Sequence, residues 1–187
     1  MTIVPNCLIH VPNFFSRSVA DEVMKDMMKD CRADFSPTAG EGRSMARYGA
    51  TYTYQGRPLK IYPWRDVLVS LKEQVQAACA SFDLNVEFNA AVLNLYKDEK
   101  TDLPLHADTR AIHQLGKEPV IACISLGSAR PFQLVEKKTG KEQRFDLGHG
   151  DLYIMHGVSQ SQYLHGAPAV ERILLPRVSV TFRHHKE

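Results

Sequence analysis

The chain has 187 residues, of which 44% are hydrophobic, which suits one domain with a single core and requires neither disulfides nor oligomerisation. Its 23 Lys and Arg residues nearly balance its 21 Asp and Glu residues, which excludes a histone-like or basic-tailed composition and leaves the partner open. We find no basic-then-apolar leader and no apolar run of roughly 18 residues, so we expect a soluble intracellular protein, cytoplasmic or, in a eukaryote, nuclear. The scattered cysteines are expected to be reduced and mostly buried: Cys7, Cys31, Cys79 and Cys123.

The first half of the chain predicts two helices separated by a polar segment. Apolar residues recur at helical spacing over about residues 16–30, where Ser18 and Asp21 have the form of a helix start. Residues 33–63 are polar and Gly-rich and contain the alternating aromatic segment YGATYTYQG, which predicts a hairpin or lid. A second amphipathic helix is expected over about residues 64–82.

From Phe88 onward the pattern changes to short β-like runs separated by turns. Many short strands in succession favour a jelly roll or sandwich over a parallel α/β sheet. There is no internal repeat or linker, so we expect a single domain over residues 1–187. The predicted strands are FNAAVLNLY, VIACISL, PFQLVE, QRFDL, DLYIM, SQYLH and RVSVTFR.

The segment His106-Ala107-Asp108 is a candidate for metal binding, because residues two apart in an extended strand project to the same face. A third ligand must come from elsewhere, and His165 in QYLHGAP, at the end of a predicted strand, is the candidate. Two histidines and one carboxylate form the facial triad of non-heme iron(II) oxygenases, which leaves three positions for a bidentate cosubstrate and dioxygen.

Alternatives to this triad exist within the sequence. His149-Gly150-Asp151 has the same H-x-D form, although it lies in a glycine-flanked turn that favours an ordinary surface or turn histidine. A His or Asp on a strand is also commonly a hydrogen-bonded structural residue. The remaining histidines are interpreted as surface or core residues: His10, His113, His156, His184 and His185.

The last predicted strand places Arg177, Ser179, Thr181 and Arg183 on one face and apolar residues on the other. The apolar face should pack into the core, and the polar face would then point two guanidinium groups into the barrel interior. Buried guanidinium groups require anions, and a dicarboxylate such as 2-oxoglutarate supplies two carboxylates that arginine binds bidentately.

Asn94 and Tyr96 share one face of the strand that precedes the H-x-D segment, and they offer an amide and a phenol as further donors. Taken alone, the pair is equally well explained as buried polar residues that need partners. Together with the arginine strand and the candidate triad, it favours a cosubstrate pocket.

These residues resemble the AlkB family of dioxygenases, whose pattern is N-x-Y, H-x-D, a later His and R-x-x-x-x-x-R on the closing strand. All four occur here in that order, and NLYKDE, SLGSARPF and LLPRVSVTFR look particularly like the DNA and RNA repair members. The match covers about residues 48–183. It implies a mainly β double-stranded β-helix (jelly roll) with N-terminal helices, Fe(II) bound by His106, Asp108 and His165, and 2-oxoglutarate and O2 as cosubstrates.

The resemblance also implies roles around the cosubstrate. Arg177 and Tyr96 should hold its distal carboxylate, Arg183 and Asn94 should contact the carboxylate that chelates iron, and Thr181 should assist. Ser179 stands where family members often have Asn, which removes one expected hydrogen bond.

The stretch Thr51-Tyr52-Thr53-Tyr54 resembles the nucleotide-recognition lid of the family, which implies that Tyr52 and Tyr54 contact the substrate and that Tyr54 stacks on a flipped base opposite His106. Such stacking is worth about 1–3 kcal/mol per base, and the base must come from a single strand or leave its duplex. The alternative is a Tyr-rich hairpin that packs on the core. The resemblance thus divides the domain into N-terminal helices and lid (1–87) and a catalytic jelly-roll core (88–187).

One departure from the family concerns Thr109 and Arg110, which stand where repair members tend to carry an acidic residue that meets the methylated base. A cation there disfavours a cationic base, so either the preferred substrate differs or Arg110 points outward to a phosphate. A predicted hairpin offers further phosphate contacts: Lys137, Lys138, Lys141 and Arg144.

The predicted function is therefore Fe(II)- and 2-oxoglutarate-dependent oxidative demethylation of alkylated bases in DNA or RNA, with release of formaldehyde, succinate and CO2, by a monomer without membrane association. One alternative is an AlkB-like hydroxylase of a protein side chain, free nucleotide or small metabolite. A non-catalytic binding module is a second. A zinc enzyme is a third, although it leaves the paired arginines unexplained.

Overall fold

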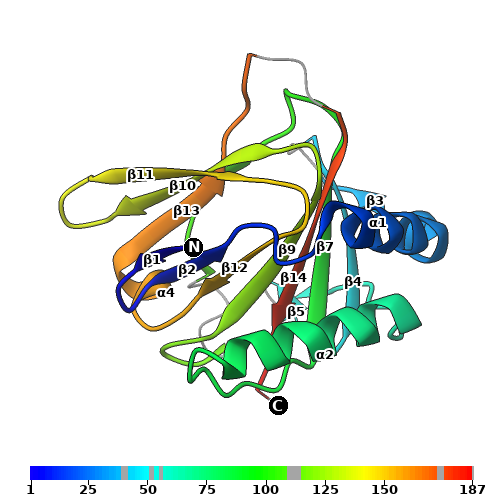
Figure 1. The fold of residues 1–187 in the computed structure, drawn as a ribbon, viewed down its shortest axis with the longest axis horizontal. Coiled ribbons are helices and arrows are strands. Elements are labelled where there is room, and N and C mark those ends of the chain that lie inside the picture. The colour runs from blue at the N-terminus through cyan, green and yellow to red at the C-terminus, as the bar shows by residue number, and fades with distance from the viewer. Residues whose placement is uncertain (39–41, 51–52, 55–56, 109–114, 172–174, 187) are drawn as a thin grey trace.

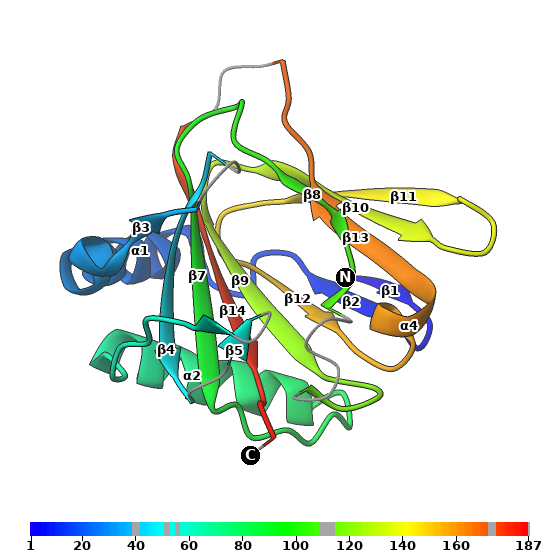
Figure 2. The ribbon, with the colours of Figure 1, turned by 180° about the vertical axis from the view of Figure 1, so that it is seen from behind.

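The computed structural model describes residues 1–38, 42–50, 53–54, 57–108, 115–171 and 175–186. Two antiparallel sheets dominate the molecule (Figures 1 and 2). The main sheet has eight strands in the order β1 (Thr2–Val4), β2 (Leu8–Val11), β12 (Asp151–Met155), β9 (Ile121–Gly127), β14 (Arg177–Arg183), β7 (Ala90–Tyr96), β4 (Ser44–Gly49) and β3 (Ser36–Pro37).

The second sheet has four strands in the order β11 (Glu142–Leu147), β10 (Arg130–Glu136), β13 (Tyr163–Ala167) and β8 (Leu103–His106). Two sheets of short antiparallel strands that enclose one interior form a jelly roll, so the predicted fold class is confirmed. A separate short hairpin joins β5 (Thr53–Tyr54) and β6 (Arg57–Pro58), within the segment where the sequence predicted a hairpin.

Both predicted helices are present. Helix α1 (Arg17–Cys31) is capped by Ser16, whose side chain accepts a hydrogen bond from the backbone N–H of Val19 at 3.4 Å, so the helix begins before Ser18 and not at it. Helix α1 continues into the short 3-10 turn η1 (Arg32–Asp34), and α2 (Asp66–Ala80) follows later. Among the described residues, no helix has the length and apolar character that crossing a membrane requires.

Four strands lie before α2 and were not predicted: β1, β2, β3 and β4. They are short, and the six residues of β4, SMARYG, do not alternate regularly between polar and apolar; β4 becomes a strand by pairing along its whole length with β7. The first 87 residues therefore contribute to the main sheet as well as supplying the helices.

The main sheet has two different faces. Its outer face packs against α1 and α2 (Figure 1) through a large apolar cluster that includes Val178, Val180 and Phe182 of β14. The inner face meets the second sheet and carries the alternate residues of β14, so the predicted parity of this strand is correct. The four cysteines are free and buried, as expected.

Candidate metal centre

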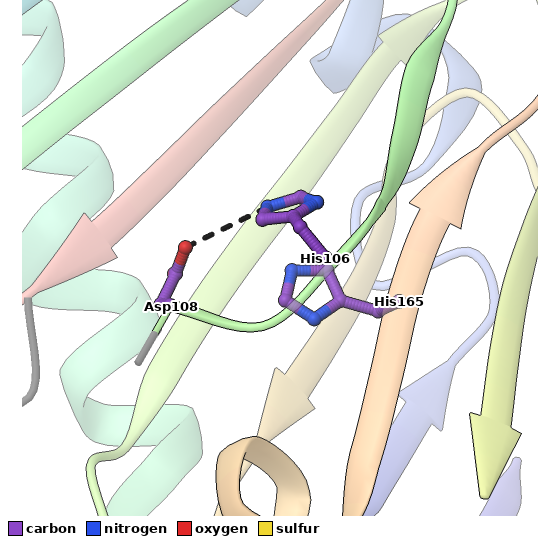
Figure 3. A group of neighbouring side chains, drawn as sticks. All are labelled: His106, Asp108 and His165. Carbon is purple, nitrogen blue, oxygen red and sulfur yellow. Dashed lines mark ion pairs between the residues drawn. The ribbon is translucent and has the colours of Figure 1, made fainter. Parts of the chain in front are cut away.

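The three candidate metal ligands come from two neighbouring strands of the second sheet. His106 is the last residue of β8, Asp108 follows two residues later, and His165 lies in β13. The antiparallel pairing places His165 directly opposite His106, and the two ring centroids are 4.3 Å apart. The ligand atoms of His106, Asp108 and His165 all lie within 4.8 Å of one another. Figure 3 shows these three side chains gathered together.

His106 presents one nitrogen to this cluster. Its Nδ1 lies 2.8 Å from the carbonyl oxygen of Pro104, and because a carbonyl only accepts, Nδ1 must carry the proton. The other nitrogen, Nε2, faces the cluster and lies 3.6 Å from Oδ1 of Asp108, where it can offer its lone pair to a metal when the ring is neutral. A backbone carbonyl that fixes the tautomer is typical of metal-binding histidines.

His165 is buried, and its imidazole ring is neutral. Burial and the neighbouring His106 imidazole lower the pKa of His165 to about 3, although Asp108 opposes the shift. The ring is therefore neutral at physiological pH, which is the form that binds metals. Within the part of the chain that the structure describes, its Nδ1 is buried without a hydrogen-bond partner, which suits a site that receives an ion.

Asp108 is held ionised. Burial alone would raise the pKa of its carboxyl group, but the Arg183 guanidinium and the imidazoles of His106 and His165 outweigh burial and lower that pKa below its usual range. The guanidinium of Arg183 donates to Oδ2 of Asp108 at 2.7 Å and leaves Oδ1 on the side of His106. One carboxylate and two imidazoles form a ligand set that fits Fe(II).

The rival H-x-D segment is occupied by structural contacts. Nδ1 of His149 accepts the backbone N–H of Gly127 at 2.8 Å, and its Nε2 lies 3.1 Å from Oδ1 of Asp21. Asp151 points elsewhere and lies 2.9 Å from Nε2 of His10. Its carboxylate also accepts backbone N–H groups of the loop and of the N-terminal segment.

The residues predicted to bind 2-oxoglutarate lie on the inner face of β7 and β14. The pairing of these strands sets Tyr96 opposite Arg177, and Asn94 opposite Ser179. Arg177 is only 2% exposed, its Nε donates to Oγ of Ser125 at 2.9 Å, and its guanidinium lies 5.1 Å from the Tyr96 ring centroid. Its terminal nitrogens have no hydrogen bond to any other described residue, so they are available to an anion.

Thr181 lies two residues after Ser179 on the same face of β14, and its hydroxyl donates to Sγ of Cys123 at 3.4 Å. Asn94 and Thr181 are both buried. The structure therefore brings all five residues of the predicted cosubstrate pocket onto one face of the main sheet.

Arg130 is a further buried cation beside Tyr96 that the sequence analysis did not single out. It is 1% exposed and comes from β10 of the second sheet, yet its guanidinium lies 5.0 Å from the Tyr96 ring centroid. It donates to the backbone carbonyl oxygens of Asp98 and Thr101, and burial together with the charge of Arg177 lowers its pKa. Its alternation with the buried Phe132 and Leu134 was the signal that it faces inward.

The predicted substrate contacts are less fully described. Tyr52, Thr109 and Arg110 lie outside the described residues, and Tyr54 is placed only through its backbone in β5. The predicted basic hairpin is β10–β11.

Two of the cations on this hairpin have local partners. Nζ of Lys137 donates to the carbonyl oxygens of Gln160 and Ser161, and Arg144 pairs with Glu142. Lys138 and Lys141 are exposed.

Comparisons with known proteins agree with this geometry. Residues 8–183 match the model of the 2OG-Fe(II) oxygenase superfamily. The chain is 31% identical over 191 residues to alpha-ketoglutarate-dependent dioxygenase alkB homolog 3 of Mus musculus, which covers 92% of this chain and 64% of that protein. It is 29% identical over 189 residues to DNA oxidative demethylase ALKBH2 of Bos taurus, covering 90% of this chain and 66% of that protein.

The fold has a close counterpart among solved structures. The structure of OsALKBH1 superposes with a TM-score of 0.74 at 18% identity and covers 98% of this chain and all of that one. The chain spans slightly less than two thirds of the length of the curated relatives named above. The predicted cofactors, Fe(II), 2-oxoglutarate and O2, are those of the matched superfamily. The chain belongs to the 2OG-Fe(II) oxygenase superfamily, and the relatives that it resembles within that superfamily are AlkB homologues.

Proposed function

We propose that this protein is an Fe(II)- and 2-oxoglutarate-dependent dioxygenase that oxidatively demethylates alkylated bases in DNA or RNA. The observation that carries the proposal is the meeting of His106, Asp108 and His165, with Asp108 bound by Arg183 of β14, the strand whose inner face also carries the buried Arg177. The similar proteins are named as a dioxygenase and as a DNA oxidative demethylase, which favours a nucleic-acid substrate.

The proposed reaction balances with one molecule each of O2, 2-oxoglutarate and methylated base. Bound iron would supply the activation of O2, with one oxygen atom entering succinate as CO2 leaves. The other oxygen hydroxylates the N-methyl group, and the resulting hemiaminal breaks its N–C bond to release formaldehyde and the restored base. The protein contributes ligands, orientation and exclusion of water.

Each proposed site residue has a task. His106, Asp108 and His165 would hold the metal, and Arg177 with Tyr96 would bind the distal carboxylate of 2-oxoglutarate. The remaining roles go to residues further along the pocket and the lid: Arg183, Asn94 and Thr181 toward the chelating end of the cosubstrate, and Tyr52, Tyr54, Thr109 and Arg110 toward the base.

The substrate is proposed to be single-stranded or to present a flipped base, because a base within a duplex cannot reach an enclosed metal site. We propose that the protein acts inside the cell as a monomer. Residues 1–187 would form one dioxygenase domain, with residues 1–87 providing helices and lid and residues 88–187 the catalytic core.

A second candidate function is hydroxylation of a protein side chain, a free nucleotide or a small metabolite. It is favoured by Thr109 and Arg110, which replace the acidic residue expected beside a cationic methylated base.

The test is a product screen by mass spectrometry on protein loaded with Fe(II). Single-stranded oligonucleotides that carry 1-methyladenine, 3-methylcytosine or other methylated bases should lose 14 mass units per methyl group, with formaldehyde and succinate formed in equal amounts. Matched unmethylated oligonucleotides and His106→Ala serve as controls. Succinate formation from 2-oxoglutarate without loss of methyl from any oligonucleotide would reject the nucleic-acid substrate in favour of the second candidate.

A further inference from the structure

The backbone at Asp108 lies outside the sheet that carries the other two candidate ligands. Strand β8 ends at His106 and, among the described strands, pairs with β13 alone, through His106 opposite His165 and Leu103 opposite Ala167, with a shift of register between them. Asp108 follows the strand, so the backbone hydrogen bonds between β8 and β13 do not fix its main chain. Something else must set its distance from His165.

Gln160 makes this connection. Its side chain is fully buried, and its Oε1 accepts the backbone N–H of Asp108 at 2.8 Å, across 52 residues of sequence. Its Nε2 faces weaker acceptors, Sδ of Met155 at 3.6 Å and Oγ of Ser159 at 3.3 Å. Because the N–H of Asp108 is a donor, the carbonyl end of the Gln160 amide must be the end that meets it.

The segment that carries Gln160 is itself held in place. Gln160 lies in the short helix α4 (Ser159–Gln162), which leads without a break into β13 and therefore into His165. Nζ of Lys137 donates to the carbonyl oxygen of Gln160 at 2.8 Å and to that of Ser161 at 2.9 Å. The short stretch from α4 into β13 thus supplies the candidate ligand His165, and through Gln160 it binds the backbone of the candidate ligand Asp108.

We propose that Gln160 is a positioning residue of the metal centre, which fixes Asp108 relative to His165. This inference rests on the metal site of the proposed function. Asp108 then has two anchors, with Arg183 holding its carboxylate and Gln160 its backbone. Gln160 does not touch the metal or the substrate in this assignment; it acts through Asp108.

The expected effect follows from what outer-shell partners contribute at metal sites. Loss of such a partner typically weakens metal affinity by about 10- to 100-fold. Without the Gln160 oxygen, the N–H of Asp108 loses its acceptor, and the main chain after β8 can move away from His165. Metal affinity should therefore fall although all three ligand side chains remain.

The experiment measures Co(II) binding to the metal-free protein by its visible absorption bands, which report both affinity and coordination geometry. Gln160→Leu removes the acceptor at similar volume and should weaken Co(II) binding about 10- to 100-fold with altered bands. Gln160→Glu keeps an acceptor oxygen at the same reach and should restore much of the affinity. Gln162→Leu is the matched control, because Gln162 is an exposed glutamine of the same helix, and it should bind Co(II) like the parent protein.

The outcomes are separable. Wild-type affinity and bands in a folded Gln160→Leu protein would overturn the positioning role, while the metal site and the proposed function would stand. If Gln160→Leu does not fold, Gln160→Asn decides, because its shorter amide cannot reach Asp108; unchanged Co(II) binding there would equally overturn the role. Failure of the parent protein to bind Co(II) would instead reject the metal site, and the positioning role with it.

Discussion

Two segments of this chain have the form H-x-D, and the structure gives them opposite uses. In the segment of His149 and Asp151, both side chains already have partners within the fold, and they serve different neighbours. In the segment of His106 and Asp108, the ligand atoms converge with those of His165. The spacing of two residues is identical, so what separates a structural from a candidate metal-binding pair is whether the surrounding fold has already satisfied its nitrogens and oxygens.

The strongest test of this difference between the two segments is to remove the candidate metal ligands one at a time. His106→Ala, Asp108→Ala and His165→Ala should each abolish turnover, because loss of one of three protein ligands weakens metal binding and opens the coordination sphere to water. Metal binding by calorimetry and succinate formation measure this. His149→Ala should bind metal and form succinate like the parent protein. If His149→Ala were the inactivating change, the segment of His149 and Asp151 would be the metal-binding one.

The second prediction concerns stability, for which the segment of His149 and Asp151 should matter and metal binding should not change. Asp151→Ala removes the acceptor of the buried His10 ring and of the part-buried hydrogen bonds from the backbone N–H groups of Asn13 and Gly148, and it should lower the free energy of unfolding by about 3 kcal/mol, measured by urea denaturation. Co(II) affinity of the folded fraction should stay unchanged. Asp21→Ala, which removes only the exposed partner of His149, is the control and should change stability by less than about 0.5 kcal/mol. Equal stability of Asp151→Ala and the parent would contradict the structural role.

A third prediction tests the anion pocket beside the converging segment. Arg177→Lys keeps the charge but loses the planar fork, so the KM for 2-oxoglutarate should rise roughly tenfold to a hundredfold, as expected for loss of a charge-assisted hydrogen bond of about 1.5–3 kcal/mol. Iron affinity should change little. Arg144→Lys on the exposed face of the hairpin is the control. An unchanged dependence of succinate formation on 2-oxoglutarate would remove Arg177 from the pocket.

The smallest effect is a dependence of stability on pH near the metal centre. Burial, together with Arg183, lowers the pKa of His185 from its ordinary value near 6.5 to about 4, although Asp108 opposes the shift. The unfolded chain therefore binds a proton that the folded chain refuses. The stability that this histidine contributes is fully present above pH 6.5 and is lost as pH falls toward 4, by about 1 kcal/mol per pH unit.

Urea denaturation of the metal-free protein between pH 7 and pH 4.5 measures this slope. His185→Gln should make it shallower by about 1 kcal/mol per pH unit, because the variant lacks this one imidazole while His165, whose pKa burial also lowers, still contributes. An identical slope in the variant and the parent would assign the pH dependence to other groups.

Several parts of the site followed from local pattern. The period of two in β14 was enough to place Arg177 and Thr181 inward and Val178 outward, because one face of a strand must join the core. The motif order pointed to His165 as third ligand, and the antiparallel register shows how it reaches His106. Local periodicity determines these features, so they are readable from the chain.

Other parts depend on partners far away in the sequence. Gln160 looks like any glutamine in a polar stretch, and only the fold brings it to Asp108. Strand β4, with the sequence SMARYG, lacks a regular alternation of polar and apolar residues and becomes part of the main sheet because β7 pairs with it. The glycine-flanked turn already favoured a structural role for the second H-x-D segment, but the contacts that occupy it, such as that of Asp151 with His10, come from the fold.

The edge position of β8 has a consequence for how the protein responds to metal supply. This strand touches the rest of its sheet along one side only, and two of the three candidate ligands lie at or just beyond its end. An ion that binds only the folded arrangement would tie this edge to β13 and stabilise the whole fold by mass action, by about 2.7 kcal/mol when free metal exceeds its dissociation constant a hundredfold. A chelator would then lower the activity and also shorten the lifetime of the folded protein. Iron starvation would lower the amount of the protein, because proteases would cleave the edge of the sheet at β8 once it opens.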